Sequence, residues 1–62
     1  MSEQYDKGVI VCNYLSSLGV HPITIAESVS DENYRKSYQL IQEKPNISKD
    51  EFLDTMGIME YK

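Results

Sequence analysis

The 62-residue chain has little of what builds a reactive or cross-linked site: one cysteine, one histidine and no tryptophan. A single cysteine cannot form an internal disulfide, and one cysteine with one histidine cannot supply the four ligands of a structural zinc site. Cys12 and His21 lie on different predicted elements, and no feature of the sequence brings them together. The GxxxxGK[ST], GxGxxG and HExxH patterns are also absent. We therefore expect no catalytic residue, cofactor or metal, and predict that the protein is not an enzyme.

Positive charge is scarce as well, because six Lys and Arg face ten Asp and Glu, for a formal net charge of −4. Nucleic acid is an unfavourable partner, since phosphates usually require a basic face. The same balance disfavours anionic membrane surfaces, and no apolar run approaches the length of a membrane span. The N-terminal MSEQYDKG lacks the basic and then apolar pattern of a signal peptide. We expect no membrane association and a cytoplasmic location, where a free cysteine stays reduced.

Length limits the stability that one copy of the chain can reach. Residues 1–62 suffice for a single small domain and contain no repeat or linker. A chain of this size buries only about 60% of the surface that its unfolded form exposes, so a monomer is marginally stable. In the absence of disulfides and metals, good helix packing or self-association must compensate. A homodimer is therefore one expected state.

The clearest local signal lies near the C-terminal end and predicts a short helix from about 49 to 56. Ser48 is a good N-cap, and Glu51, three residues later, completes a capping box. Ile47 and Phe52 flank this cap at the positions of a hydrophobic staple, which fixes the angle at which the chain enters the helix.

The same helix has an equally clear end. Gly57 can take the left-handed conformation that closes a helix, and Ile58 can then pack back onto Leu53. Two turns of helix are not stable alone in water, so the apolar face of this segment must dock. We expect it to fill the protein's own core, and the alternative is a detachable tail that inserts into a partner's groove.

A first helix is predicted at 3–18, with Ser2 as its N-cap and Gly19 as the glycine that follows its end. Its apolar residues fall on one broad face of a helical wheel. A competing interpretation exists for 8–15, because three consecutive β-branched residues also fit a short buried strand. The helix is preferred because both of its ends carry caps and no partner strand is visible elsewhere.

The middle of the chain predicts two further helices. Thr24 followed by Glu27 forms another capping box, which opens a short helix at 24–29. Ser30 then caps a longer helix at 31–43. Two favourable i,i+4 ion pairs are expected on its outer surface: Asp31–Arg35 and Glu32–Lys36.

Together these segments predict an all-α fold, a compact bundle of three to four short helices at about 3–18, 24–29, 31–43 and 49–56. Its core is expected to consist of Val11, Leu15, Leu18, Ile25, Val29, Tyr34, Tyr38, Ile41, Phe52, Leu53 and Ile58.

Exclusion of other classes leaves a small acidic non-catalytic protein-interaction module, such as a regulator, inhibitor or accessory subunit, with a protein as its partner. Five tyrosines favour this function, because tyrosine buries an apolar ring while it keeps a polar tip. The predicted interface residues are Ile10, Tyr14, Met59 and Tyr61. Ile10 and Tyr14 form a second apolar edge on the first helix, which is either a self-association surface or an ordinary partly exposed face.

The alternative function is DNA binding, because a short helix at 24–29 followed by a longer one at 31–43 has the outline of a helix-turn-helix. Ser30 and Asp31 occupy the turn, where such motifs usually place a glycine and an apolar residue. Asp31 and Glu32 would also face phosphates at the start of the recognition helix. A further alternative is an acidic competitor of nucleic-acid binding, which would use its negative surface against another protein's basic groove.

Overall fold

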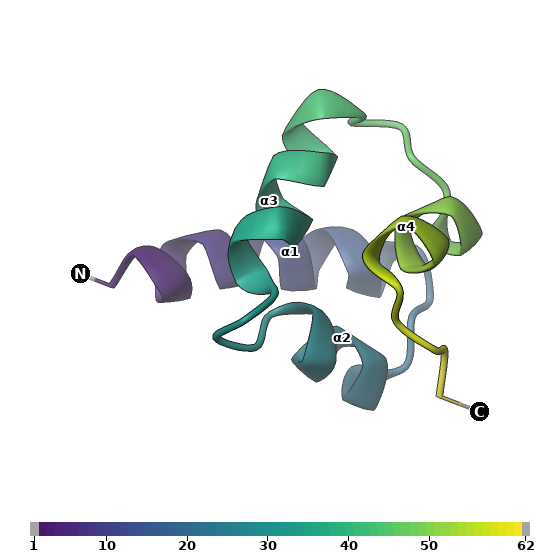
Figure 1. Ribbon diagram of the computed structural model, residues 1–62, viewed down its shortest axis with the longest axis horizontal. Coiled ribbons are helices and arrows are strands. Elements are labelled where there is room, and N and C mark those ends of the chain that lie inside the picture. Colours follow the sequence, from purple (N-terminus) through teal and green to yellow (C-terminus); the bar gives the residue numbers. More distant parts are fainter. Residues whose placement is uncertain (1, 62) are drawn as a thin grey trace.

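The computed structural model describes residues 2–61, which form four helices joined by short turns (Figure 1). The helices are α1 at Glu3–Ser17, α2 at Pro22–Ser28, α3 at Tyr34–Glu43 and α4 at Lys49–Met56. No strand occurs within residues 2–61, so the predicted all-α fold is confirmed. Residues 8–15, for which a strand was the competing interpretation, lie inside α1.

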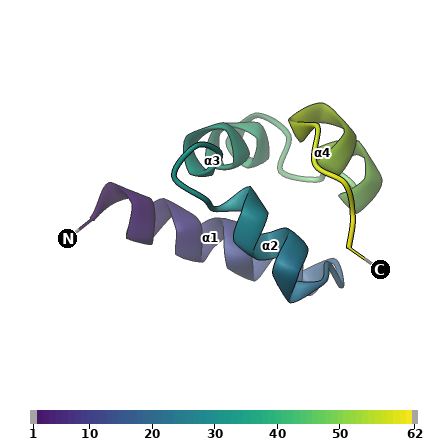
Figure 2. The same cartoon turned by 60° about the horizontal axis from the view of Figure 1, so that its bottom comes forward.

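Helix α1 is the longest element; α2 and α3 pack directly against it, and α4 packs against α3. Helix α3 crosses α1 steeply, as Figure 1 shows, while α4 lies toward the C-terminal end of α1. In the turned view of Figure 2, α1 runs along the bottom with α3 and α4 above it. None of the helices within residues 2–61 is long and apolar enough to cross a membrane.

The core lies between α1, α3 and α4 and includes residues of the segments next to these helices. Val11 and Leu15 of α1 and Phe52 of α4 are completely buried. The buried core cluster consists of Val11, Leu15, Val20, Ile41, Ile47, Phe52, Leu53 and Ile58. Among the predicted core residues, Tyr34 is also buried, whereas Leu18, Ile25, Val29 and Tyr38 are only partly buried and pack against the cluster.

Two buried apolar residues of the core cluster, Val20 and Ile47, were missing from the predicted core, and the burial of both follows from the way helices begin and end. The Val20 amide donates to the Leu15 carbonyl oxygen at 3.1 Å, which folds Val20 back beneath α1. Ile47 precedes the N-cap of α4 and is buried in the same cluster as Phe52, as expected for a hydrophobic staple.

Helix α4 ends as the sequence predicts. Gly57 has φ +72°, and the Ile58 amide donates to the Leu53 carbonyl oxygen at 3.0 Å. At the other end, Ser48 Oγ accepts from the Glu51 amide at 3.2 Å. The predicted return bond of the capping box, from the Ser48 amide to the Glu51 carboxylate, is wrong. The Glu51 carboxylate instead pairs with Lys44 Nζ at 3.0 Å.

The predicted start of α2 is wrong by two residues. The helix begins at Pro22, whose fixed φ suits the first helical position. His21 is the N-cap, and its Nδ1 accepts from the Ile23 amide at 3.1 Å. Thr24 therefore lies inside the helix as a buried residue and does not cap it. Helix α1 likewise ends at Ser17, one residue before the predicted end.

The predicted start of α3 is wrong by three residues. The amides of Asn33 and Tyr34 both donate to the Ser30 carbonyl oxygen, which makes residues 31–33 a turn that precedes the helix. A side chain stabilises this turn, because Asn33 Nδ2 donates to the Glu27 carbonyl oxygen at 3.0 Å.

The two ion pairs predicted along α3 are also wrong. Asp31 lies outside the helix, and its carboxylate accepts from Gln4 Nε2 of α1 at 2.6 Å. Arg35 pairs with Glu3 of α1, and Glu32–Lys36 is not among the ion pairs formed within residues 2–61.

The exposed surface shows that one copy of the chain is already compact. Its area is 4210 Å², and the size scaling of monomeric proteins gives roughly 4,100 Å² for this mass. The folded chain therefore exposes about as much surface as a monomeric protein of its mass.

A stabilising substitution is expected at Gly8, in the middle of α1. Glycine there costs about 0.5–1 kcal/mol relative to alanine, and an added Cβ would lie 3.7 Å from Val29 Cβ, an ordinary contact. We expect Gly8→Ala to raise the free energy of unfolding by about 0.5–1 kcal/mol in urea titrations. Gly57→Ala is the matched control and should lower it, because φ is +72° there. A less stable Gly8→Ala would show that the packing of α1 against α2 rejects a methyl group.

Candidate functional site

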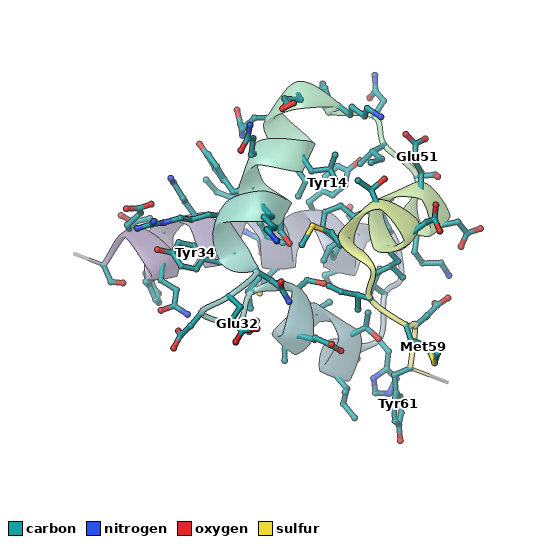
Figure 3. The ribbon with its side chains drawn as sticks, viewed as in Figure 1. Tyr14, Glu32, Tyr34, Glu51, Met59 and Tyr61 are labelled. Carbon is teal, nitrogen blue, oxygen red and sulfur yellow. The ribbon has the colours of Figure 1, made fainter. Side chains whose placement is uncertain are left out.

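The four residues predicted to form an interface lie in different places. Met59 and Tyr61 follow α4 and point outward at one edge of the molecule, whereas Tyr14 lies between α3 and α4 (Figure 3). Ile10 is 43% exposed on α1. The structure therefore brings Met59 and Tyr61 together and separates them from Tyr14.

Tyr14 has a role inside the fold. Its side chain is half-buried against the core, and its hydroxyl donates to the Ile47 carbonyl oxygen at 2.6 Å. This bond ties α1 to the segment that precedes α4. Of the two residues of the predicted apolar edge, Tyr14 thus packs within the fold and Ile10 remains exposed.

Large apolar side chains are exposed both on α2 and on the C-terminal segment, which contacts α2 through Tyr61. We call Ile23, Met59 and Tyr61 the C-terminal patch; their exposed fractions are 53%, 89% and 50%. The His21 and Tyr61 rings have centroids 4.4 Å apart and planes inclined by 49°. His21 also accepts from the Ile23 amide, so its ring contacts both Tyr61 and the first turn of α2.

Three contacts fix the C-terminal segment in place. The Tyr61 amide donates to Oγ1 of the buried Thr24 at 2.8 Å. Glu60 pairs with Lys49 Nζ at 3.0 Å, and Ile58 is buried in the core. Met59 and Tyr61 are therefore presented on a fixed backbone.

The sequence-based interface prediction included Met59 and Tyr61 but not His21 or Ile23. The Pro22 that follows His21 was a usable signal, because proline at the first helical position makes the preceding residue the N-cap. The pairing of α2 with residues 57–61 had no local signal.

The buried serines of α2 and α3 form hydrogen bonds that join the two helices. Ser28 Oγ donates to the Thr24 carbonyl oxygen at 2.9 Å, and Ser37 Oγ donates to the Ser28 carbonyl oxygen at 2.7 Å. Within residues 2–61 every buried side-chain nitrogen and oxygen has a hydrogen-bond partner. The same part of the chain holds no cluster of three or more His, Cys, Asp or Glu placed to bind a metal.

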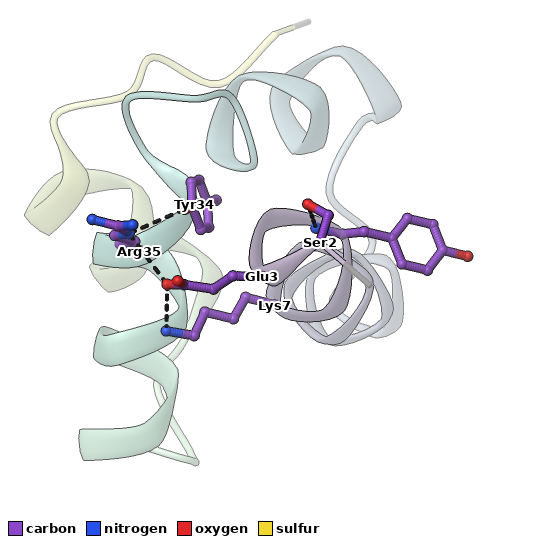
Figure 4. Close-up of polar contacts among 6 residues, drawn as sticks. Ser2, Glu3, Lys7, Tyr34 and Arg35 are labelled. Carbon is purple, nitrogen blue, oxygen red and sulfur yellow. Dashed lines mark hydrogen bonds and ion pairs between the residues drawn. The ribbon is translucent and has the colours of Figure 1, made fainter.

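Charge is concentrated at the N-terminal end of α1, where Glu3 binds two cations (Figure 4). Glu3 Oε2 lies 2.9 Å from Lys7 Nζ and 3.2 Å from Arg35 Nε, so the carboxylate links α1 to α3. Arg35 Nε also donates to the Tyr34 hydroxyl at 3.0 Å. The hydrogen bond from Lys7 lowers the pKa of Glu3, and the positive charges of Arg35 and Lys7 lower it further.

This lowered pKa predicts an acid-sensitive link. The folded state favours the charged carboxylate, so the contribution to stability is complete above the ordinary Glu pKa of about 4.3 and is lost as pH falls through the lower folded value. An NMR titration of the Glu3 side chain should show a midpoint below the ordinary one. Lys7→Gln should raise the midpoint more than Arg35→Gln. An unchanged midpoint in Lys7→Gln would contradict the assignment of its cause.

The residues considered for DNA binding and for catalysis are engaged in the fold. Arg35, at the start of the would-be recognition helix, is bonded to Glu3 and Tyr34. His21 caps α2, and Cys12 is partly buried on α1.

Comparison of the chain with models of protein families, with curated proteins and with solved structures found no match. The function is therefore inferred from the exposed residues of this chain.

Proposed function

We propose that the protein is a small acidic, non-catalytic interaction module, a regulator, inhibitor or accessory subunit of the cytoplasm, that binds a protein partner through the C-terminal patch. The observation that carries this proposal is the fixed backbone under an exposed methionine and tyrosine. Tyrosine and methionine are enriched at protein interfaces. A surface that is ordered before binding loses less conformational entropy when a partner docks.

The distribution of charge supports a partner with basic residues at its rim. Seven of the ten carboxylates form no ion pair within residues 2–61, because only Glu3, Glu51 and Glu60 do. Lysines and arginines within the same residues are mostly paired. The remaining negative charge would steer a basic partner toward the module and would repel acidic ones.

A comparative capture experiment tests the patch. The wild-type protein, a Met59→Ser/Tyr61→Ser variant and a control Gln42→Ser/Asn46→Ser variant, which changes two other exposed residues, would be immobilised and exposed to host extract. We expect one protein to bind the wild type and the control, and to bind the patch variant at least about tenfold more weakly. Equal capture by all three would show that the patch is not the interface.

Two further measurements test the other possible partners, which are a second copy of the chain and DNA. Light scattering that gives twice the chain mass of 7.2 kDa, reduced to the chain mass in the patch variant, would identify the partner as a second copy. A gel shift with duplex DNA at low salt that weakens steeply as salt rises would replace this proposal with nucleic-acid binding.

A further inference from the structure

A second apolar surface lies between α1 and the end of α2, away from the C-terminal patch residues. It is an open groove of about 460 Å³, which we call the α1 groove. The residues that line it include Gln4, Tyr5, Gly8, Val9, Cys12 and Val29. Tyr5 and Val9 are exposed although they are large and apolar. Neither residue has a role in the core.

Gly8 gives an independent reason to regard this groove as a binding site. It is buried, lies inside a helix and lines the groove. Glycine destabilises a helix interior, yet the fold does not require it here, because an added Cβ would make only an ordinary contact with Val29. The consequence of the missing side chain is a deeper groove.

Two carboxylates lie close to residues that line the groove. Asp6 lies one helical turn before Val9, and Asp31 is bonded to Gln4, which lines the groove. The nearest cations of α1 and α3, Lys7 and Arg35, are both bonded to Glu3. A second copy would bring the same acidic residues against these and would be repelled.

We infer that the α1 groove receives an amphipathic helix of a partner protein, with apolar residues that enter the groove and Lys or Arg beside them that face Asp6 and Asp31. An amphipathic helix presents three to four apolar side chains over two turns, which suits an open apolar groove. This inference rests on the proposed interaction function and adds a second surface and the chemistry of its partner.

A defined peptide tests the inference. The probe is a synthetic helix of about 15 residues with leucines on one face and lysines beside them, and its match carries glutamates in place of the lysines. Fluorescence anisotropy should show that the lysine peptide binds at least about tenfold more tightly than the glutamate peptide, and more weakly as salt rises. Equal binding of the two peptides, or no binding of either at about 1 mM, would overturn the inference.

Adjacent positions on α1 supply matched variants. Val9 and Ile10 are 40% and 43% exposed, but only Val9 lines the groove. Val9→Lys should weaken the lysine peptide at least about tenfold, whereas Ile10→Lys, with the same change of charge, should weaken it no more than about twofold. Equal losses would show general charge attraction and would overturn the inference. Thermal melts would confirm that both variants are folded.

Gly8→Ala keeps the test independent of folding, because it is expected to be at least as stable as the wild type while it makes the groove shallower. It should weaken the lysine peptide measurably, and unchanged affinity would place the peptide elsewhere. The Met59→Ser/Tyr61→Ser variant should bind the peptide as the wild type does. If the lysine peptide does not bind the wild type, while the Met59→Ser/Tyr61→Ser variant captures its partner from extract less well than the wild type, the groove inference is wrong and the proposed function stands. If the peptide binds the groove, but the patch variant captures the partner as well as the wild type does, only the C-terminal patch is excluded as an interface.

Discussion

Replacing Phe52 by alanine is expected to unfold a large share of the protein. Phe52 is fully buried in the core of α1 and α4. Truncation of a buried phenylalanine costs about 3–5 kcal/mol, because apolar contacts are lost and a cavity remains. A domain of this length has a total stability of roughly 3–9 kcal/mol. Circular dichroism in a urea titration should show the midpoint shifted far toward zero denaturant.

The control for this substitution is Met59→Ala, on the C-terminal patch. Met59 is 89% exposed, so its truncation should change the free energy of unfolding by no more than about 0.5 kcal/mol. If Phe52→Ala were as stable as the wild type, α4 would not share a core with α1 in solution. That result would favour the detachable tail over the packed helix.

The ends of α4 were predictable because every interaction that defines them is local. Ser48 caps an amide three residues away, and Gly57 permits a bond between residues five apart. Such patterns depend on the order of residues alone and not on the rest of the fold. The same holds for α1, where Ser2 and Gly19 mark the ends correctly to within one residue.

The boundaries of α2 and α3 were predicted wrongly because equivalent local patterns compete there. Thr24 followed by Glu27 satisfies the capping pattern, yet Pro22 starts the helix earlier. Ser30 accepts from Asn33 and Tyr34 through its backbone carbonyl, and no side-chain bond caps α3. Asp31 is held by Gln4, which is 27 residues distant in the chain. No local rule predicts such a contact.

In the candidate site, too, local features could be read from the sequence and contacts between distant segments could not. Met59 and Tyr61 are recognisable as apolar residues beyond the last cap of the chain. Tyr14 was assigned to the interface from its place on a helical wheel, which does not show the bond of its hydroxyl to the Ile47 carbonyl, 33 residues away. Tyr61 reaches Thr24 across 37 residues. Contacts between distant segments therefore decide which apolar residues stay exposed and on what backbone.

The contact between Thr24 and Tyr61 links the fold to the candidate site. Thr24 is buried inside α2, and its hydroxyl is the acceptor for the Tyr61 amide of the C-terminal segment. Valine has nearly the shape of threonine but offers no acceptor. In Thr24→Val the Tyr61 amide must either remain unpaired, at a cost of about 1–3 kcal/mol, or move into water.

Because Tyr61 is half exposed, we expect release of the segment to limit the loss of stability in Thr24→Val to about 1 kcal/mol. The Tyr61 amide should then exchange with solvent much faster, and the His21 ring resonances should move as the 4.4 Å contact with Tyr61 is lost. Binding of the partner at the C-terminal patch should weaken with it. Thr24→Ser is the matched control, because it keeps the acceptor and should keep the amide protected. Unchanged exchange in Thr24→Val would mean that Ile58 and the Glu60–Lys49 pair hold the segment without this bond, and that the patch does not depend on α2.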